Sequence, residues 1–309
     1  MSQILVVGSL AYDSIETPSG KSPKTLGGSA NYFSLAASLL SKVRVVGVVG
    51  EDYADEDYQL LEKRNVDLSG LEKVKGKTFH WEGFYEGSLN EAKTLKTDLN
   101  VFEHFNPKLP EAFKDSQFVF LANIAPELQL QVLSQVKNPK FVGMDTMNFW
   151  ISSKKSILMD VLKKVNVILI NEGESQMLTG AANAISAAIA ISKLGPEAVV
   201  VKRGEYGFIL YHREHGFFAL PAMTMPEVID PTGAGDTFAG GFFGTLAGMD
   251  RRPSFEDMKK ACVVGTLLAS FTIQDFGVKS LAKVNMSALK SRRDEYKKTV
   301  SFEKDFVEI

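Results

Sequence analysis

The 309-residue sequence combines 45% hydrophobic residues with 35 basic and 37 acidic ones, which is the balance of an ordinary globular protein. Its net charge of -2 gives no electrostatic reason to expect nucleic acid or a membrane as a partner. No apolar run approaches the roughly 18 residues that a transmembrane helix needs. The single cysteine, Cys262, excludes an internal disulfide and is typical of a reducing compartment. We therefore expect a cytoplasmic protein.

Short apolar runs alternate with helix-like stretches along the chain. Strands that are apolar on both faces and separated by helices indicate a mostly parallel sheet with helices on both faces. The sequence therefore predicts one α/β domain over residues 1–309. The expected strands are Ile4–Gly8, Val43–Gly50, Phe118–Asn123, Phe141–Asp145, Val167–Asn171 and Ala198–Gly204, and the expected helices are Ser29–Ser41, Pro126–Val136, Lys154–Lys164 and Asn183–Leu194.

Two segments interrupt this alternation, residues 11–26 and residues 77–105. The first is polar and rich in turns, and the second is predicted to form strands through Phe105. Together they could form a small β lid beside the main domain. The second segment carries the aromatic residues Phe79, Trp81, Phe84 and Tyr85. These either pack the small sheet's own face, or cover a site or form a dimer contact, since exposed aromatic patches usually have partners.

In parallel sheets, ligands bind beyond the carboxyl ends of the strands. Several expected strands end there in polar residues, namely Asn123, Asp145 and Asn171. We expect the functional site at this edge.

The stretch DPTGAGDTF, Asp230–Phe238, is predicted to be a loop that leads into a helix. Gly233 and Gly235 would leave the amides between them unshielded at a helix N-terminus, where an oxyanion is favoured. Asp236 would stand beside this anion hole as a proton acceptor. A proton acceptor beside an anion hole is what phosphoryl transfer to a hydroxyl group requires. The alternative is an ordinary aspartate cap with glycine-rich packing.

Three more glycines, Gly240, Gly241 and Gly244, fall inside the helix that follows. Glycine in a helix costs up to about 1 kcal/mol relative to alanine. We expect these glycines to let the helix lie close to the sheet.

The same region carries a family resemblance. DPTGAGDTFAGGF is one of four signature-like stretches, with LGGSANYFSLAASLL (Leu26–Leu40), NEGE (Asn171–Glu174) and KRGEYG (Lys202–Gly207). They resemble, respectively, the C-terminal signature, the N-terminal signature, the N-x-x-E motif and the nucleotide loop of the ribokinase-like carbohydrate kinases, the PfkB family. Along the chain they occur in the order that this family has. The resemblance covers essentially the whole chain. It implies a ribokinase-like fold, ATP as phosphate donor and Mg²⁺ as cofactor.

The resemblance also implies a role for each matching residue. Asp236 would be the base that deprotonates the accepting hydroxyl, with Gly233, Ala234 and Gly235 as the anion hole. The residues that would bind the acceptor are Asp13, Gly27, Gly28 and Asn31. Those on the nucleotide side would be Asn171, Lys202, Gly204 and Gly207. Glu174 would help to order Mg²⁺ through water, although a solvated acid at a helix start would explain it equally.

The sequence departs from the family pattern in two places. Lys202 and Arg203 replace the usual threonine region, so that a cation could meet phosphate there or be solvated. Asp230 and Thr232 lie where some relatives help to bind a monovalent cation, but Phe271–Gly277 does not match that part of the pattern.

We interpret the sequence as an ATP-dependent kinase that phosphorylates a hydroxymethyl group of a sugar. The alternative within the same fold is a nucleoside kinase, because the lid aromatics could stack on a base. An alternative from another class is a non-catalytic sugar-binding protein, although a pure binder needs no base. The expected partners are a small-molecule substrate and, through the lid, a second copy of the chain, with neither nucleic acid nor membrane.

Overall fold

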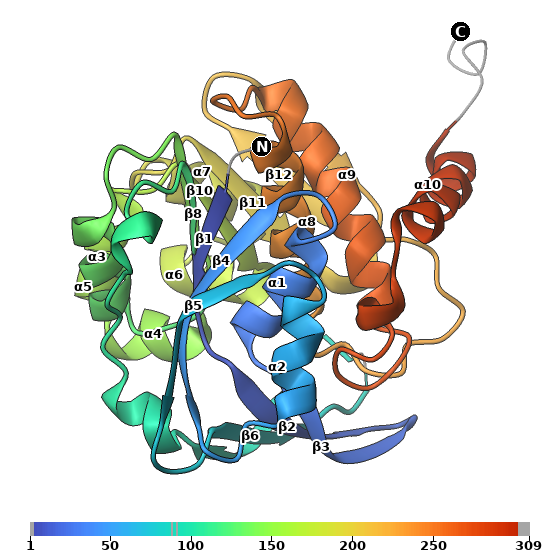
Figure 1. Cartoon of the computed structure of the whole chain (residues 1–309). Coiled ribbons are helices and arrows are strands. Elements are labelled where there is room, and N and C mark those ends of the chain that lie inside the picture. The colour runs from blue at the N-terminus through green and yellow to red at the C-terminus, as the bar shows by residue number, and fades with distance from the viewer. Residues whose placement is uncertain (1–2, 88, 91, 302–309) are drawn as a thin grey trace, which may run out of the picture.

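The centre of the molecule is a large, mostly parallel sheet (Figure 1). The computed structural model describes residues 3–87, 89–90 and 92–301. Within them the sheet has nine strands, in the order β13 (Gly216–Leu220), β12 (Phe208–His212), β11 (Ala198–Lys202), β10 (Val167–Asn171), β9 (Phe141–Met144), β8 (Phe118–Leu121), β1 (Gln3–Val7), β4 (Lys42–Gly50) and β5 (Asp67–Val74). Only the β11–β12 and β12–β13 pairs of this described sheet are antiparallel. The predicted sheet is confirmed.

Helices cover both faces of this sheet (Figure 1). Ile4 and Val6 of β1 belong to one buried apolar cluster, and Leu5 and Val7 to a second, because successive strand residues point to opposite faces. The first cluster is covered by α1 (Ser29–Ala37), α2 (Asp55–Glu62), α8 (Ala234–Gly248), α9 (Phe255–Thr272) and α10 (Met286–Val300), the second by α3 (Pro126–Gln135), α4 (Asn148–Ser153), α5 (Lys155–Leu162), α6 (Glu172–Thr179) and α7 (Ala184–Ser192). None of the helices in the described part of the chain is long and apolar enough to cross a membrane.

The two interrupting segments form a separate sheet with four strands in the described residues, in the order β3 (Gly20–Gly27), β2 (Ala11–Thr17), β6 (Phe79–Phe84) and β7 (Lys93–Asp98). Strands β2 and β6 pair in parallel and join the two segments, which lie far apart in the sequence. The predicted small β sheet is confirmed, and it is called the lid below.

The expectation of strand through Phe105 is wrong, because Asn100–His104 forms a 3₁₀ helix. The chain turns at Asn100, which has a φ of 49° and whose side-chain amide donates to the carbonyl of Thr78 (3.0 Å). This turn lets the Phe102 ring stack between those of Phe79 and Phe105, with centroids 5.4 Å away on each side.

The lid aromatics therefore differ from one another in role. Phe79 belongs to the stack just described, and Trp81 lies across Gly83 and donates to Thr94 Oγ1 (3.1 Å). The four aromatic side chains considered in the sequence analysis are at least partly buried, namely Phe79, Trp81, Phe84 and Tyr85. They do not form an exposed patch, and only Tyr85 takes part in the site described below.

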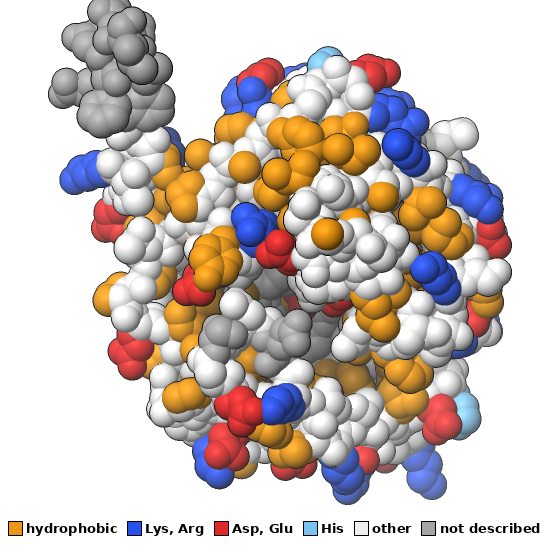
Figure 2. Space-filling model, turned by 180° about the vertical axis from the view of Figure 1, so that it is seen from behind, with side chains coloured by type: hydrophobic (Ala, Val, Ile, Leu, Met, Phe, Trp, Pro, Cys, Tyr) orange, Lys and Arg blue, Asp and Glu red, His pale blue; other side chains and the backbone are white. Residues whose placement is uncertain are grey.

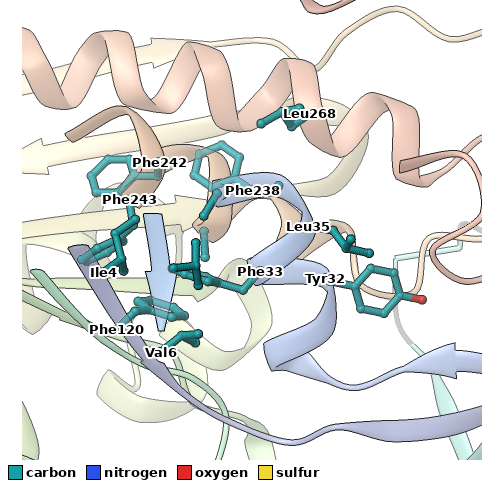
Figure 3. Close-up of a cluster of buried hydrophobic side chains, with 14 of the residues drawn as sticks. Ile4, Val6, Tyr32, Phe33, Leu35, Phe120, Phe238, Phe242, Phe243 and Leu268 are labelled. Atoms are coloured by element: carbon teal, nitrogen blue, oxygen red, sulfur yellow. The ribbon is translucent and has the colours of Figure 1, made fainter. Parts of the chain in front are cut away.

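The glycines of α8 serve packing against helices, and the expectation that they bring it close to the sheet is wrong. Gly240 and Gly244 lie against the backbone of α1, and Gly241 lies against Gly265 of α9. Figure 3 shows the result, with side chains of all three helices meeting in one apolar cluster above β1. The glycines thereby hold the start of α8 in a fixed place relative to α1.

Candidate active site

Polar side chains meet at the carboxyl ends of neighbouring strands, as predicted. Asp145 follows β9, while Asn171 ends β10 beside its register partner Lys202 at the end of β11. Lys202 Nζ lies 3.0 Å from Asp145 Oδ2, with side-chain exposures of only 17% and 8%. Lys202 is therefore an almost buried, paired cation, and the alternative that it is merely solvated is wrong.

The loop before α8 places free backbone amides close to this ion pair. Gly233 has a φ of 74°, a conformation that favours glycine, and the Tyr32 ring fills the space beside it. The amide of Ala234 donates to the carbonyl of Pro231 (3.2 Å), whereas those of Gly233 and Gly235 have no hydrogen-bond partner among the described residues. A Cβ at residue 235 would lie 3.0 Å from Lys202 Nζ. Two amides and a cation thus offer a site for an anion.

Asp236 lies in the first turn of α8, next to these donors. Burial of its carboxyl and the charge of Asp145 raise its pKa to about 7, against the opposing effect of Lys202. A carboxylate with a pKa near neutrality can both lose and accept a proton under ordinary conditions. Its place and its pKa suit a general base.

Asp13 of β2 forms a second buried carboxyl on the lid side. It is 5% exposed, and burial together with the charges of Asp230 and Asp236 raises its pKa to about 8. Gly27 packs directly against the Asp13 carboxyl, in space that a side chain would otherwise take, and the Gly28 amide donates to Asp13. Three of the four predicted acceptor-binding residues therefore form one contiguous unit.

The fourth, Asn31, points elsewhere. It is fully buried, its Nδ2 donates to the Gly27 carbonyl (2.6 Å), and its Oδ1 accepts from the Tyr53 hydroxyl (3.2 Å). Both ends of the amide are thus engaged within the protein. Asn31 supports Gly27 from behind.

On the predicted nucleotide side, Asn171 and Glu174 cap the start of α6 reciprocally. Asn171 Oδ1 accepts from the Glu174 amide (2.7 Å), and Glu174 Oε2 accepts from the Asn171 amide (3.0 Å). Burial and the charge of Asp145 raise the pKa of Glu174 to about 7. The same two causes raise the pKa of Asp236.

Gly204 and Gly207 lie in the tight loop between β11 and β12, where the Gly207 amide donates to the Gly204 carbonyl (3.1 Å). The side chain of Asn90, from the turn between β6 and β7, lies directly against Gly204. The lid therefore reaches from the Asp13 side of the site to this loop.

Three residues of the site had no individual role assigned from the sequence, although Tyr85 was one of the aromatics considered to cover a site. Asp145 was seen only as a polar strand end, and nothing in the sequence shows that β9 and β11 bring it to Lys202. Tyr85 of the lid accepts from Thr232 Oγ1 (3.2 Å), close to Asp230 and Asp236. Tyr32 lies beneath Gly233, and its position inside the LGGSANYF stretch was the only available signal.

Comparison with known proteins identifies the family of this chain. Residues 1–284 match the pfkB family carbohydrate kinase. The cytidine kinase of Thermococcus kodakarensis is 31% identical over 265 residues, which make up 83% of this chain and 92% of that protein.

Solved structures of similar proteins share the fold. The nucleoside kinase of Methanocaldococcus jannaschii has a TM-score of 0.76 at 20% identity, over 96% of this chain and 99% of that one. The fructokinase of Vibrio cholerae O395, with fructose, ADP and calcium bound, has a TM-score of 0.77 at 20% identity, over 94% and 98% of the two chains. The family match extends over most of this chain, and it confirms the resemblance carried by the four sequence stretches. The chain belongs to the pfkB family of carbohydrate kinases, and it is an ATP-dependent kinase.

Proposed function

We propose that this kinase transfers the γ-phosphoryl group of MgATP to a hydroxymethyl group of a sugar or of a sugar-containing small molecule. The chain works as one kinase domain, residues 1–309, whose lid segments 11–26 and 77–105 cover the acceptor. The observation that carries the proposal is the position of Asp236, in the first turn of α8 beside the free amides of Gly233 and Gly235.

In this reaction Asp236 takes the proton of the acceptor hydroxyl. The hydroxyl oxygen then forms its bond to phosphorus, the bond from phosphorus to the departing ADP oxygen breaks, and the proton stays on the Asp236 carboxyl. A pKa of about 7 suits both acceptance and later release of this proton. The amides of Gly233 and Gly235, with Lys202, stabilise the charge on the transferred group. The Ala234 amide would join them if it left its bond to Pro231.

On the nucleotide side we propose Asn171, Lys202, Gly204 and Gly207. Lys202 is the group best placed for a phosphate, because its ammonium lies beside the backbone of Gly235. Gly204 and Gly207 carry no side chains, so they keep the β11–β12 loop that follows Lys202 small.

Glu174 fits a magnesium ion bound partly through water. Among the described residues, no group of three His, Cys, Asp or Glu side chains is placed to hold a metal by itself. Magnesium needs no such group, since it keeps several waters and binds one or two carboxylates together with substrate phosphates. Bound there, the ion would neutralise charge on those phosphates. Glu174 has one carboxylate oxygen on the Asn171 amide and can offer the other.

We propose that Asp13, Gly27 and Gly28 face the acceptor, with Asn31 as their support. The oxygens of the Asp13 carboxyl can accept hydrogen bonds from hydroxyl groups, which favours a polyhydroxylated ring. Basic and acidic side chains are interspersed over the face in Figure 2. The similarity to a cytidine kinase favours a nucleoside over a free sugar.

The test is ADP release from MgATP with pentoses, hexoses and nucleosides, including D-ribose, D-fructose, cytidine and adenosine. ADP release that depends on one of these compounds supports the proposal, and the identity of that compound decides between a sugar and a nucleoside as substrate. Binding of a compound without any ADP release would favour the non-catalytic sugar-binding alternative.

We also propose a homodimer through the lid. Strand β7 is an edge of the lid sheet, and its Leu95 is 60% exposed. Sedimentation should show a dimer that Leu95→Lys dissociates, while the matched exposed variant Ile185→Lys on α7 leaves it intact. A monomeric wild type would contradict this part of the proposal.

A further inference from the structure

The Tyr32 hydroxyl is a buried polar group without a hydrogen-bond partner among the described residues. The side chain is 1% exposed and comes from α1, in the middle of the glycine-rich N-terminal stretch. A phenylalanine would fill the same space without this unsatisfied donor, which costs free energy in the folded protein. The hydroxyl therefore calls for an explanation that the apolar core does not give.

The Tyr32 side chain points from α1 toward the loop before α8. Successive helix residues point about 100° apart, so that Tyr32 and Asn31 leave α1 toward different surroundings. Asn31 is hydrogen-bonded to Gly27 and Tyr53, whereas the Tyr32 ring lies against Gly233 in the loop Asp230–Gly233 before α8, called the anion loop below. In Figure 3 the Tyr32 ring stands at the margin of the apolar cluster, and its oxygen points away from the other labelled side chains.

The Tyr32 hydroxyl is surrounded by titratable groups. It interacts electrostatically with Asp13 of β2, Asp230 of the anion loop, Asp236 of α8 and Tyr85 of the lid. These groups come from β2, the loop before α8, α8 itself and the segment after β6. Burial and the three carboxylates keep the pKa of Tyr32 well above its usual value, so the phenol remains a neutral donor.

We propose that Tyr32 determines acceptor specificity by donating its hydroxyl hydrogen bond to an oxygen of the bound acceptor. The inference rests on the proposed function and deepens it. Asp13 accepts bonds from hydroxyl groups of the acceptor, whereas Tyr32 requires a lone pair, as on a ring ether or a further hydroxyl. The substrate class is therefore a polyhydroxylated ring that turns donors toward Asp13 and an acceptor oxygen toward Tyr32.

Tyr32→Phe tests the inference, with Tyr296→Phe as the matched control. Tyr296 on α10 is similarly buried, but its hydroxyl already donates to the Pro221 carbonyl (2.7 Å). The probes are D-ribose, D-fructose, cytidine and adenosine. The measurements are the KM for the active compound, the KM for ATP, and Tm with and without that compound.

In Tyr32→Phe the KM for the acceptor should rise about tenfold or more, as expected for the loss of one buried hydrogen bond. The KM for ATP should stay within about twofold of wild type. The Tm of the free protein should be equal or higher, because no existing bond is lost, and the rise in Tm on adding the acceptor should shrink. Tyr296→Phe should show the opposite pattern. Its Tm should be lower, because an existing hydrogen bond is lost, and its KM for the acceptor should be unchanged.

An unchanged acceptor KM in Tyr32→Phe would overturn the inference, and so would a lower Tm with both KM values raised alike. A wild type that binds a probe without releasing ADP would contradict the kinase reaction alone, and the thermal shift would still decide the role of Tyr32. A wild type that binds none of the probes would contradict both.

Discussion

The Asp13 carboxyl occupies the space that a Cβ at residue 27 would need. Asp13 is almost fully buried in a close-packed environment, so a methyl group at residue 27 must push its carboxyl aside. We predict that Gly27→Ala displaces this carboxylate and raises the KM for the acceptor by about tenfold or more, with the KM for ATP nearly unchanged. Steady-state kinetics with each substrate varied in turn measure both values.

Gly248→Ala is the matched control for this substitution. A Cβ at residue 248 meets its nearest neighbour, the Leu40 carbonyl oxygen, at an ordinary 3.5 Å. This variant should keep both KM values. Equal effects of the two substitutions, or none in Gly27→Ala, would mean that Gly27 does not position Asp13 for the acceptor.

We predict that the Asp145–Lys202 ion pair influences the pH range of activity through the pKa of Asp236. If Asp236 must be ionised to act as base, kcat/KM for the acceptor rises with pH through a limb near pH 7. Asp145 raises the pKa of Asp236 and Lys202 lowers it. Asp145→Asn should therefore move the limb to lower pH, and Lys202→Met should move it to higher pH.

The opposite signs make this a strict test of the electrostatic account. The profile is measured for both variants under the same conditions as for wild type, with ATP saturating, since Lys202→Met should also raise the KM for ATP. A limb that stays in place in both variants, or that moves in the same direction in both, would show that another group controls the reaction.

Because Glu174 takes part in the reciprocal cap of α6, its structural role can be tested apart from its proposed magnesium-binding role. Glutamine can make the same capping contact, but it lacks the charge that favours Mg²⁺. We predict that Glu174→Gln keeps its Tm within a few degrees of wild type and needs a higher Mg²⁺ concentration for half-maximal activity. A variant with an unchanged Mg²⁺ requirement would leave Glu174 with the cap alone.

The sequence predicted the parallel core because each buried strand is a short, apolar and β-branched run. It predicted the start of α8 because Gly233 and Gly235 precede Asp236 there, a pattern that folding alone does not require. It did not reveal β5, whose outer half is charged and exposed, as in EKV at its end. The β12–β13 hairpin was missed as well, although four of the five residues of β12 are buried and β13 alternates between partly buried and exposed residues.

The contents of the site were less predictable than its location. The sequence named Lys202 but could not pair it with Asp145, because the ion pair depends on the order of strands in the sheet. The glycine-rich motif pointed to Asn31, whereas the helix turns Asn31 toward Tyr53 and presents Tyr32 to the anion loop. A motif fixes which residues are near a site, but the helix that carries it decides which of them face it.

The central claim is that Asp236 is the general base, and Asp236→Asn tests it most directly. Asparagine is similar in size and still suits a helix start, so the free energy of unfolding should change by about 1 kcal/mol at most. It cannot accept the hydroxyl proton, and base catalysis contributes on the order of 10²–10⁴-fold. The measurement is kcat at saturating acceptor and MgATP, with folding checked by thermal denaturation. We predict a folded protein that still binds its acceptor and whose kcat falls by at least about a hundredfold; a folded protein that keeps more than about a tenth of the wild-type kcat would contradict the claim.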